Sequence, residues 1–200
     1  VPEPYGNYTA INQVELTVSR DLYNWQRVAD RRVFIGIDPW DGINYGTTQN
    51  LLCGKPYIHE NKEIWIYYNA LRFRGPMEFY DKQYHTYFDD ASALCLAKLR
   101  LDGFVSLDAK LEGEIISKPF ETTGGDLFVN ADASAGQLRA EVLDSHTMLP
   151  ISGLNISLCE SVTEDGINLR VDWSGKARMQ RGNMVRIRFH LNDAKLYAFW

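Results

Sequence analysis

The sequence has no long apolar run, no strongly basic segment and no signal peptide at its start. Apolar stretches fall short of the roughly 18 residues that a transmembrane helix needs, so we expect no membrane partner. Runs of basic residues do not exceed two, and the formal net charge of the 200 residues is −5. Because phosphate backbones bind clustered lysine and arginine, no nucleic-acid partner is expected either. The opening residues, "VPEPYGNYT", lack the basic start and apolar run of a secretory signal.

Cysteine is scarce, and metal-binding motifs are missing. Cys53, Cys95 and Cys159 allow either one disulfide with a free thiol or three buried thiols. Their spacing is not that of a zinc site, so no zinc ion is assigned. Asp81 and the pair Asp89-Asp90 offer carboxylates, but they lack the alternating spacing of a calcium loop. We therefore expect no metal and no cofactor.

Helical periodicity is almost absent, and apolar residues instead alternate with a period of two. Turn residues recur at the intervals of about 8–12 residues that are typical of β-sandwiches, barrels and propellers. The alternation is clear in Glu63–Ala70 and Gln137–Asp144. It is also clear in Met184–Trp200, which we expect to bend into a hairpin at Asn192-Asp193 and to direct His190 outward. Only Met77–Asp90 breaks the pattern, and it predicts a long loop. The fold class is therefore all-β.

Two similar stretches predict hairpins. The first is "LTVSRDLYNWQRV" and the second is "LCLAKLRLDGFVSL", which turns at the hairpin dipeptide Asp102-Gly103. Two further strands lie between them, and four successive antiparallel strands make one propeller blade. Residues 50–109 thus predict a complete blade, and residues 14–28 predict the outer half of the preceding one. Because unpaired strand edges find partners, we expect the remaining blades to come from the same parent polypeptide or from another chain. Cys53 and Cys95 would lie on non-adjacent strands, so a disulfide between them is not expected.

The quoted motifs as a set resemble a known family. "SRDLYNWQRV", "WDGINYG", "EIWIYYNA" and "LRLDGFVSLDA" are similar to the last blades of five-bladed propellers of glycoside hydrolase families 32 and 43. "LFVNADASAGQLRAEVLD", "PISGLNISLCESV", "VDWSG" and "VRIRFHLNDAKLYAFW" resemble the C-terminal β-sandwich of glycosyl hydrolase family 32 domain proteins. The resemblance implies a partial five-bladed β-propeller of about one and a half blades in residues 1–110 and a β-sandwich in residues 111–200. It also implies a carbohydrate partner, typically a fructoside or a related sugar.

The catalytic motifs of that family are missing from this chain. The family places its acids in Asn-Asp-Pro, Arg-Asp-Pro and Glu-Cys motifs. Here Asp38-Pro39 lacks the preceding Asn or Arg, and Cys159-Glu160 has the reversed order. No catalytic residue is assigned. Two functions stay open: the C-terminal portion of a secreted glycoside hydrolase-like protein, whose hydrolytic carboxylates lie mostly outside this chain, and a non-catalytic carbohydrate-binding or structural glycoprotein.

The best local cluster for binding a sugar lies in "IDPWDGINY". Trp40 can stack on a sugar face while Asp38 and Asp41 accept hydrogen bonds from hydroxyl groups, and Asn44 and Tyr45 follow directly. The competing interpretation is an aspartate-rich turn with Trp40 packed between blades.

Two sequons are candidate sites of N-glycosylation. They are Asn7-Tyr8-Thr9, in a segment rich in proline and glycine, and Asn155-Ile156-Ser157. Glycosylation at Asn7 or Asn155 would fit a secreted, extracellular protein, which is the localisation that we expect.

Overall fold

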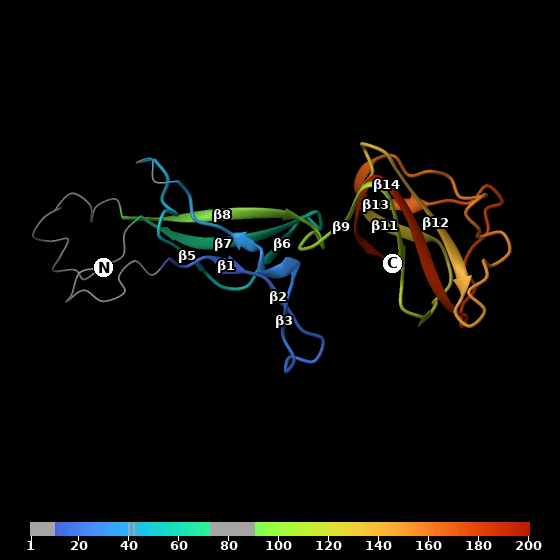
Figure 1. Ribbon diagram of the computed structural model, residues 1–200. Coiled ribbons are helices and arrows are strands. Elements are labelled where there is room, and N and C mark those ends of the chain that lie inside the picture. Colours follow the sequence, from blue (N-terminus) through green and yellow to red (C-terminus); the bar gives the residue numbers. More distant parts are fainter. Residues whose placement is uncertain (1–10, 40, 42, 73–90) are drawn as a thin grey trace, which may run out of the picture. The chain divides into compact units, whose positions relative to one another are not determined.

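The computed structural model describes residues 11–39, 41, 43–72 and 91–200, and these residues form an all-β fold (Figure 1). They contain fourteen strands and one short 3-10 helix, η1 (Ala29–Arg31), and no α-helix. The predicted fold class is confirmed. Within the described residues the strands form several antiparallel sheets, and no sheet closes on itself. Three predicted features, Asn7, Trp40 and the loop Met77–Asp90, lie outside the described residues.

The chain divides into two compact units, Val1–Leu99 and Arg100–Trp200. The first unit begins with two small sheets. In the first sheet β1 (Val14–Glu15) pairs with β4 (Val33–Ile35), and in the second β2 (Thr17–Val18) pairs with β3 (Gln26–Arg27). The first predicted hairpin is therefore present.

The turn of this hairpin is held by Asp21. Its carboxylate accepts hydrogen bonds from the backbone N–H groups of Tyr23 and Asn24, at 2.9 and 2.8 Å. Trp25 does not pack into a core, because its side chain is exposed and its indole N–H donates to the carbonyl oxygen of Leu22. The aspartate and the short polar residues of the motif thus specify the turn, while the tryptophan remains at the surface.

The main sheet of the first unit contains β5 (Gln49–Leu52), β6 (Tyr57–His59), β7 (Glu63–Leu71) and β8 (Ser92–Arg100). β5 and β6 pair with successive parts of β7, so they correspond to one predicted strand that is interrupted between residues 52 and 57. β8 also pairs with β7. The predicted strand Glu63–Ala70 is confirmed.

The second predicted hairpin is wrong. Its two halves join different sheets: β8 pairs with β7, whereas the next strand, β9 (Leu107–Ile116), pairs with β14 (Met184–Phe199). The expected turn does form, with Asp102 at a φ of 53° and a hydrogen bond of 3.0 Å from the Gly103 N–H to the Arg100 carbonyl. A turn dipeptide fixes only the local chain reversal. The partner of β9 is set by its apolar side chains, which pack against the core of the second unit.

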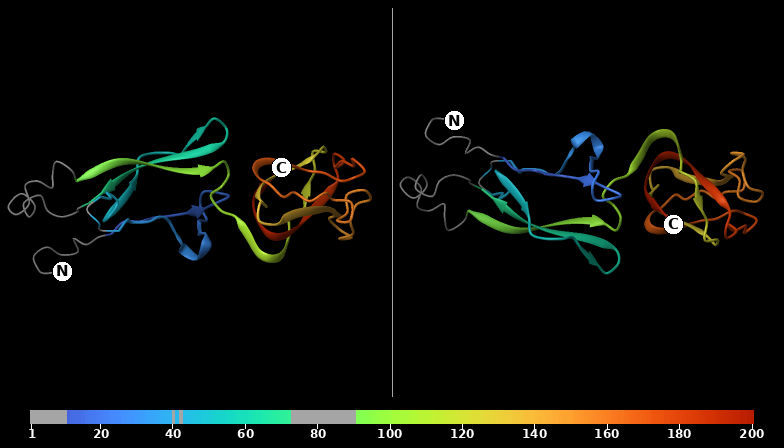
Figure 2. Two further views of the ribbon diagram at one scale, coloured as in Figure 1. Left: turned by 90° about the horizontal axis from the view of Figure 1, so that it is seen from above. Right: turned by 90° about the horizontal axis from the view of Figure 1, so that it is seen from below.

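The second unit is organised around β14, which is drawn in red in Figure 2. β14 is one strand of 16 residues, not the predicted hairpin. It pairs with β9, β10 (Phe120–Glu121), β11 (Leu127–Asp132) and β12 (Gln137–Asp144), and β13 (Asp165–Val171) pairs with β11. Asn192-Asp193 forms an irregularity in register, with Asp193 at a φ of 41°. β9 continues to pair with β14 on both sides of this point, so the chain bends there and does not reverse.

One apolar core lies in the second unit. Nineteen buried residues between Leu127 and Leu196 form a single cluster, to which β12 contributes Leu138, Ala140 and Val142. The intervening β12 residues face the opposite side of the sheet, as the alternation of a strand requires. The described part of the first unit buries only Ile64, Ile66 and Ala70 among its apolar side chains. The packed core of this chain is therefore the core of its second unit.

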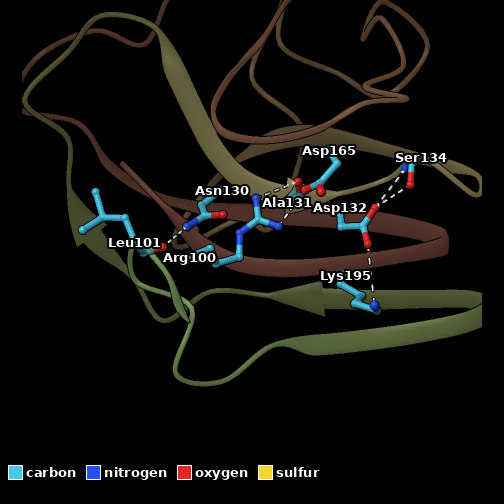
Figure 3. A network of polar contacts seen from close by, with 8 residues as sticks. All are labelled: Arg100, Leu101, Asn130, Ala131, Asp132, Ser134, Asp165 and Lys195. Carbon is cyan, nitrogen blue, oxygen red and sulfur yellow. Dashed lines mark hydrogen bonds and ion pairs between the residues drawn. The ribbon is translucent and has the colours of Figure 1, made fainter. Parts of the chain in front are cut away.

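A polar network binds the start of the second unit to its sheet (Figure 3). The guanidinium of Arg100 lies 2.6 Å from a carboxylate oxygen of Asp165 and 4.4 Å from the ring centre of Tyr197. Asn130 donates to the carbonyl oxygen of Leu101 at 2.5 Å. These contacts explain why the second unit begins at Arg100. The boundary expected from the sequence, between residues 110 and 111, lies inside β9.

All three cysteines are free. Cys53 is exposed and Cys95 is half-buried, while Cys159 lies in the core of the second unit. Burial raises the pKa of the Cys159 thiol, although the backbone N–H of Ala140 donates to its Sγ at 3.2 Å. The structure thus matches neither cysteine arrangement left open by the sequence. The described residues also contain no helix that is long and apolar enough to span a membrane.

Candidate functional site

The predicted site residues Asp41 and Asn44 form a hydrogen-bonded turn. One carboxylate oxygen of Asp41 accepts from the backbone N–H groups of Ile43 and Asn44, at 2.8 and 2.9 Å. The side-chain amide of Asn44 donates to the other oxygen at 2.7 Å. Since both carboxylate oxygens already accept hydrogen bonds from the turn, this geometry favours the aspartate-rich-turn interpretation for Asp41.

These hydrogen bonds favour the charged form of Asp41. The backbone N–H of Asn44, and after it that of Ile43, hold the pKa of the Asp41 carboxyl below its usual value. A carboxyl group with a lowered pKa is ionised at neutral pH, so Asp41 is unsuited to act as a general acid there.

Tyr45 is covered by an arginine that the sequence did not single out. The guanidinium of Arg72 lies 4.1 Å from the centre of the Tyr45 ring. It also donates to the backbone carbonyls of Asn44 and Ile43, at 3.1 and 2.8 Å. Arg72 follows β7, and no spacing or motif connects it with residues 43–45. The arginine fixes the loop, and it occupies one face of the ring that could otherwise stack on a sugar.

Asp38 lies in a different part of the same loop and faces the sheet. Its backbone N–H donates to the Gly46 carbonyl at 2.8 Å, and the Gly46 N–H donates to the Asp38 carboxylate at 3.2 Å. A Cβ atom on Gly46 would lie 2.7 Å from both Asp38 Oδ2 and Asn50 Oδ1, so this position requires glycine. Tyr68 lies on β7, and its pKa is raised by burial and by the nearby Cys95 and Asp38. Asp38 therefore lies close to β7, and through Gly46 it lies close to Asn50 of β5.

Asn50 is the least exposed polar residue of this region, and sequence reasoning missed it. It is 3% exposed, and its amide donates to the Gly36 carbonyl at 2.6 Å. Its Oδ1 is buried and has no hydrogen-bond partner. Only its place at the start of an apolar strand could have drawn attention to it. The role of Asn50 is to hold the Gly36–Gly46 loop against β5.

The aromatic side chains of β6 and β7 mostly contact one another. His59 stacks on Trp65, with ring centres 3.9 Å apart, and Lys98 Nζ lies 4.8 Å from the centre of the Trp65 ring. The Trp65 indole donates to Glu63 at 2.7 Å. Trp65 is therefore engaged by its neighbours on the sheet.

The second sequon has a defined turn geometry. Asn155 is half-buried, and its side-chain oxygen accepts from Ser157 Oγ at 2.7 Å and from the Leu158 N–H at 3.2 Å. Glycosylation at Asn155 stays a prediction. Across the part of the chain that the structure describes, no group of three or more His, Cys, Asp or Glu side chains is placed to hold a metal ion.

Comparisons with known proteins identify no relative. No family model, curated protein or solved structure matches this chain. The resemblance drawn from the sequence motifs therefore stays a prediction, and the function is argued from the structure below.

The hydrogen bonds of the turn predict the titration of Asp41. Its carboxyl group should titrate below the value of about 3.9 for a free aspartate, because the folded turn stabilises the charged form. The turn then contributes stability above the unfolded pKa and loses it as pH falls through the folded pKa. Carbon-detected NMR of the carboxyl group measures the midpoint, and Asp41→Asn serves to assign the resonance. A midpoint at or above about 3.9 would contradict the prediction.

Proposed function

We propose that this chain is the C-terminal portion of a secreted, glycoside hydrolase-like carbohydrate-active protein. Its first unit is the final part of a five-bladed β-propeller, completed by blades from the same parent polypeptide or another chain. Its second unit is the accompanying β-sandwich. The observation that carries the proposal is that both faces of the β5–β8 sheet expose large apolar side chains.

Neighbouring residues along its strands show this exposure. Leu51 and Leu52 are 42% and 50% exposed, and Tyr57 and Ile58 are 58% and 55% exposed. Consecutive residues of a strand point to opposite faces of the sheet, so each pair places one apolar side chain on each face. β8 adds Leu94, which is also exposed. Apolar surface of this extent, on both faces, calls for a partner layer on each.

A propeller blade meets this requirement, because each blade packs between two neighbouring blades. A sheet with one solvent-facing side would instead alternate apolar with polar residues. The hairpin β2–β3 fits the outer half of a preceding blade, as its sequence predicts. The proposal therefore accounts for the exposed faces and for the small core of the first unit together.

Sugar hydrolysis in this proposal depends on carboxylates outside the chain. A retaining glycosidase needs one ionised and one protonated carboxyl group, roughly 5–5.5 Å apart. Asp41 is held in a turn with a lowered pKa, and Asp38 accepts a hydrogen bond from Gly46. The chain contributes the loop of residues 36–46 to the surface that contacts the sugar, while the acid and the nucleophile lie on other blades.

The hydrogen bonds that hold Asp41 in its turn support a second function, a non-catalytic carbohydrate-binding or structural glycoprotein. Asp41, one of the two carboxylates that the sequence suggests for contact with a sugar, accepts the hydrogen bonds of a turn. A protein that keeps the fold without catalytic acids would need no carboxyl group with a raised pKa in this loop.

The intact mass and sedimentation of the native protein test the proposal. We expect a polypeptide longer than 22.9 kDa, or a stable complex with a second chain. Leu52→Ser should weaken the association or destabilise the longer protein, whereas Leu149→Ser, at an exposed position of the second unit, should not. A folded monomer of 22.9 kDa, without a partner, would overturn the proposal.

Activity assays on the complete protein then separate the two functions. Hydrolysis of a fructoside or an arabinoside supports the enzyme. Saturable binding of these sugars without hydrolysis supports the non-catalytic alternative.

A further inference from the structure

A polar hollow on the outer face of the second unit is lined by residues of β9, β12 and β14. Figure 1 labels these strands. Its volume is about 440 Å³, within the range of about 300–1,000 Å³ that small-molecule sites occupy. The strands place their outward side chains in rows across the sheet. Glu114, His190 and Arg139 form one row. Glu112, Asn192 and Gln137 form the next.

A third row, formed by Arg188 and Glu141, lies next to the hollow. Glu141 is 4% exposed, and Arg188 Nη1 lies 2.9 Å from one of its oxygens. Arg188 Nε lies 3.3 Å from a carboxylate oxygen of Glu114, which lines the hollow. The buried carboxylate and its arginine therefore help to fix the position of Glu114.

Arg139 is a free donor at the hollow. Its half-buried side chain makes no hydrogen bond or ion pair with any residue that the structure describes. His190 is not a second free donor, because its Nε2 is buried 3.5 Å from a Glu141 oxygen and its Nδ1 lies 3.9 Å from a Glu114 oxygen. A guanidinium group without a partner in a concave surface indicates a place for a ligand that accepts hydrogen bonds.

We propose that this hollow binds a neutral saccharide through its hydroxyl groups. Its lining offers both acceptors and a donor: the carboxylates of Glu112 and Glu114 accept, while Arg139 donates. A pair of neighbouring sugar hydroxyls both donates and accepts, so it can bridge a carboxylate and the guanidinium. The residues that line the hollow include no Phe, Tyr or Trp, so binding relies mainly on hydrogen bonds.

The charged groups in and beside the hollow favour a neutral ligand over an anion or a cation. Three carboxylates in and beside the hollow oppose a phosphate or another anion. Two guanidinium groups oppose a metal ion or an organic cation. The apolar face of the sheet points into the core, so the hollow offers little to an apolar ligand. A neutral ligand rich in hydroxyl groups satisfies both signs of charge.

This site is independent of the proposed function, because it lies within the second unit and requires neither additional blades nor hydrolysis. A complete protein without glycosidase activity would leave it intact.

Calorimetric titration of the full chain with fructose, arabinose, glucose, galactose and their trisaccharides tests the proposal. We expect saturable binding of at least one of these sugars. Arg139→Ala should raise the dissociation constant about tenfold or more, because hydrogen bonds to a charged donor are lost. Glu114→Gln should also weaken binding, and Arg181→Ala, at an exposed arginine outside the hollow, should leave it unchanged.

Variants of Arg139 separate a loss of sugar binding from a loss of folding. Arg139 has no hydrogen-bond or ion-pair partner among the described residues, so Arg139→Ala and Arg139→Gln should melt like the wild type. Chemical shift changes in NMR then locate the sugar on β9, β12 and β14. The proposal is overturned by absence of saturable binding, by binding that Arg139→Ala leaves unchanged, or by displacement of the sugar with inorganic phosphate or calcium chloride.

Discussion

A fragment of residues 100–200 is expected to fold on its own, whereas residues 1–99 are expected to remain largely unfolded or to aggregate. The nineteen-residue core lies entirely in the second unit. The described part of the first unit buries three apolar side chains and exposes many more. Apolar burial is the main force that offsets the loss of chain entropy on folding. Among the described residues, only those of the second unit bury apolar side chains in quantity.

Calorimetry and circular dichroism measure this difference. The second fragment should unfold in one cooperative transition, with an enthalpy of about 60–80 kcal/mol, as is usual for a domain of 100 residues. The first fragment should show no such transition and should bind a hydrophobic dye. A cooperative transition in residues 1–99 would contradict the prediction.

A shorter fragment is the matched control, because it begins at the boundary expected from the sequence. Residues 111–200 lack Arg100, which pairs with Asp165, and Leu101, which accepts from Asn130. They also lack the first part of β9, which pairs with Ala194–Leu196 of β14. This fragment should therefore melt at a lower temperature than residues 100–200. Equal melting temperatures would show that residues 100–110 do not belong to the second unit.

Much of the fold follows from local patterns in the sequence. Alternation gave Glu63–Ala70 and Gln137–Asp144, because the period of two is a property of each strand by itself. It also placed His190 on the outer face. The predictions that failed concern pairing. Asp102-Gly103 forms a turn, but the flanking strands join different sheets. Asn192-Asp193 carries a turn-favouring pair, yet β9 continues along β14 past it. Pairing depends on side chains that are far apart in the sequence.

The same distinction holds for the candidate sites. Asp41 and Asn44 are three positions apart, and the turn that they form is readable from the motif. Arg72 contacts residues 43–45 across almost thirty positions, and no motif links them. The hollow of the second unit needs the register of three strands, because Glu114, His190 and Arg139 meet only when β9, β14 and β12 are aligned. The alternation of a sequence predicts which face of a strand is buried more readily than it predicts the register between neighbouring strands.

Leu138→Ala is expected to destabilise the second unit by about 2–5 kcal/mol, which is the usual cost of truncating a fully buried leucine. Leu138 is 0% exposed in the middle of the core, where β12 pairs with β14. For a domain of this size the melting temperature should fall by about 8 °C or more. Leu149→Ala is the control, since Leu149 is 66% exposed and its loss should cost less than about 0.5 kcal/mol.

The position of Leu138 also allows an experiment to separate the stability of the core from sugar binding in the hollow. Leu138 and Arg139 are neighbours on β12, so their side chains point to opposite faces of the sheet. Leu138→Ala should lower stability and, below its melting temperature, leave sugar binding in the hollow unchanged. Arg139→Ala should do the reverse. If Leu138→Ala melts like Leu149→Ala, the core is not where the structure places it. If Arg139→Ala lowers the melting temperature as much as Leu138→Ala does, Arg139 does not lie on the outer face of the sheet.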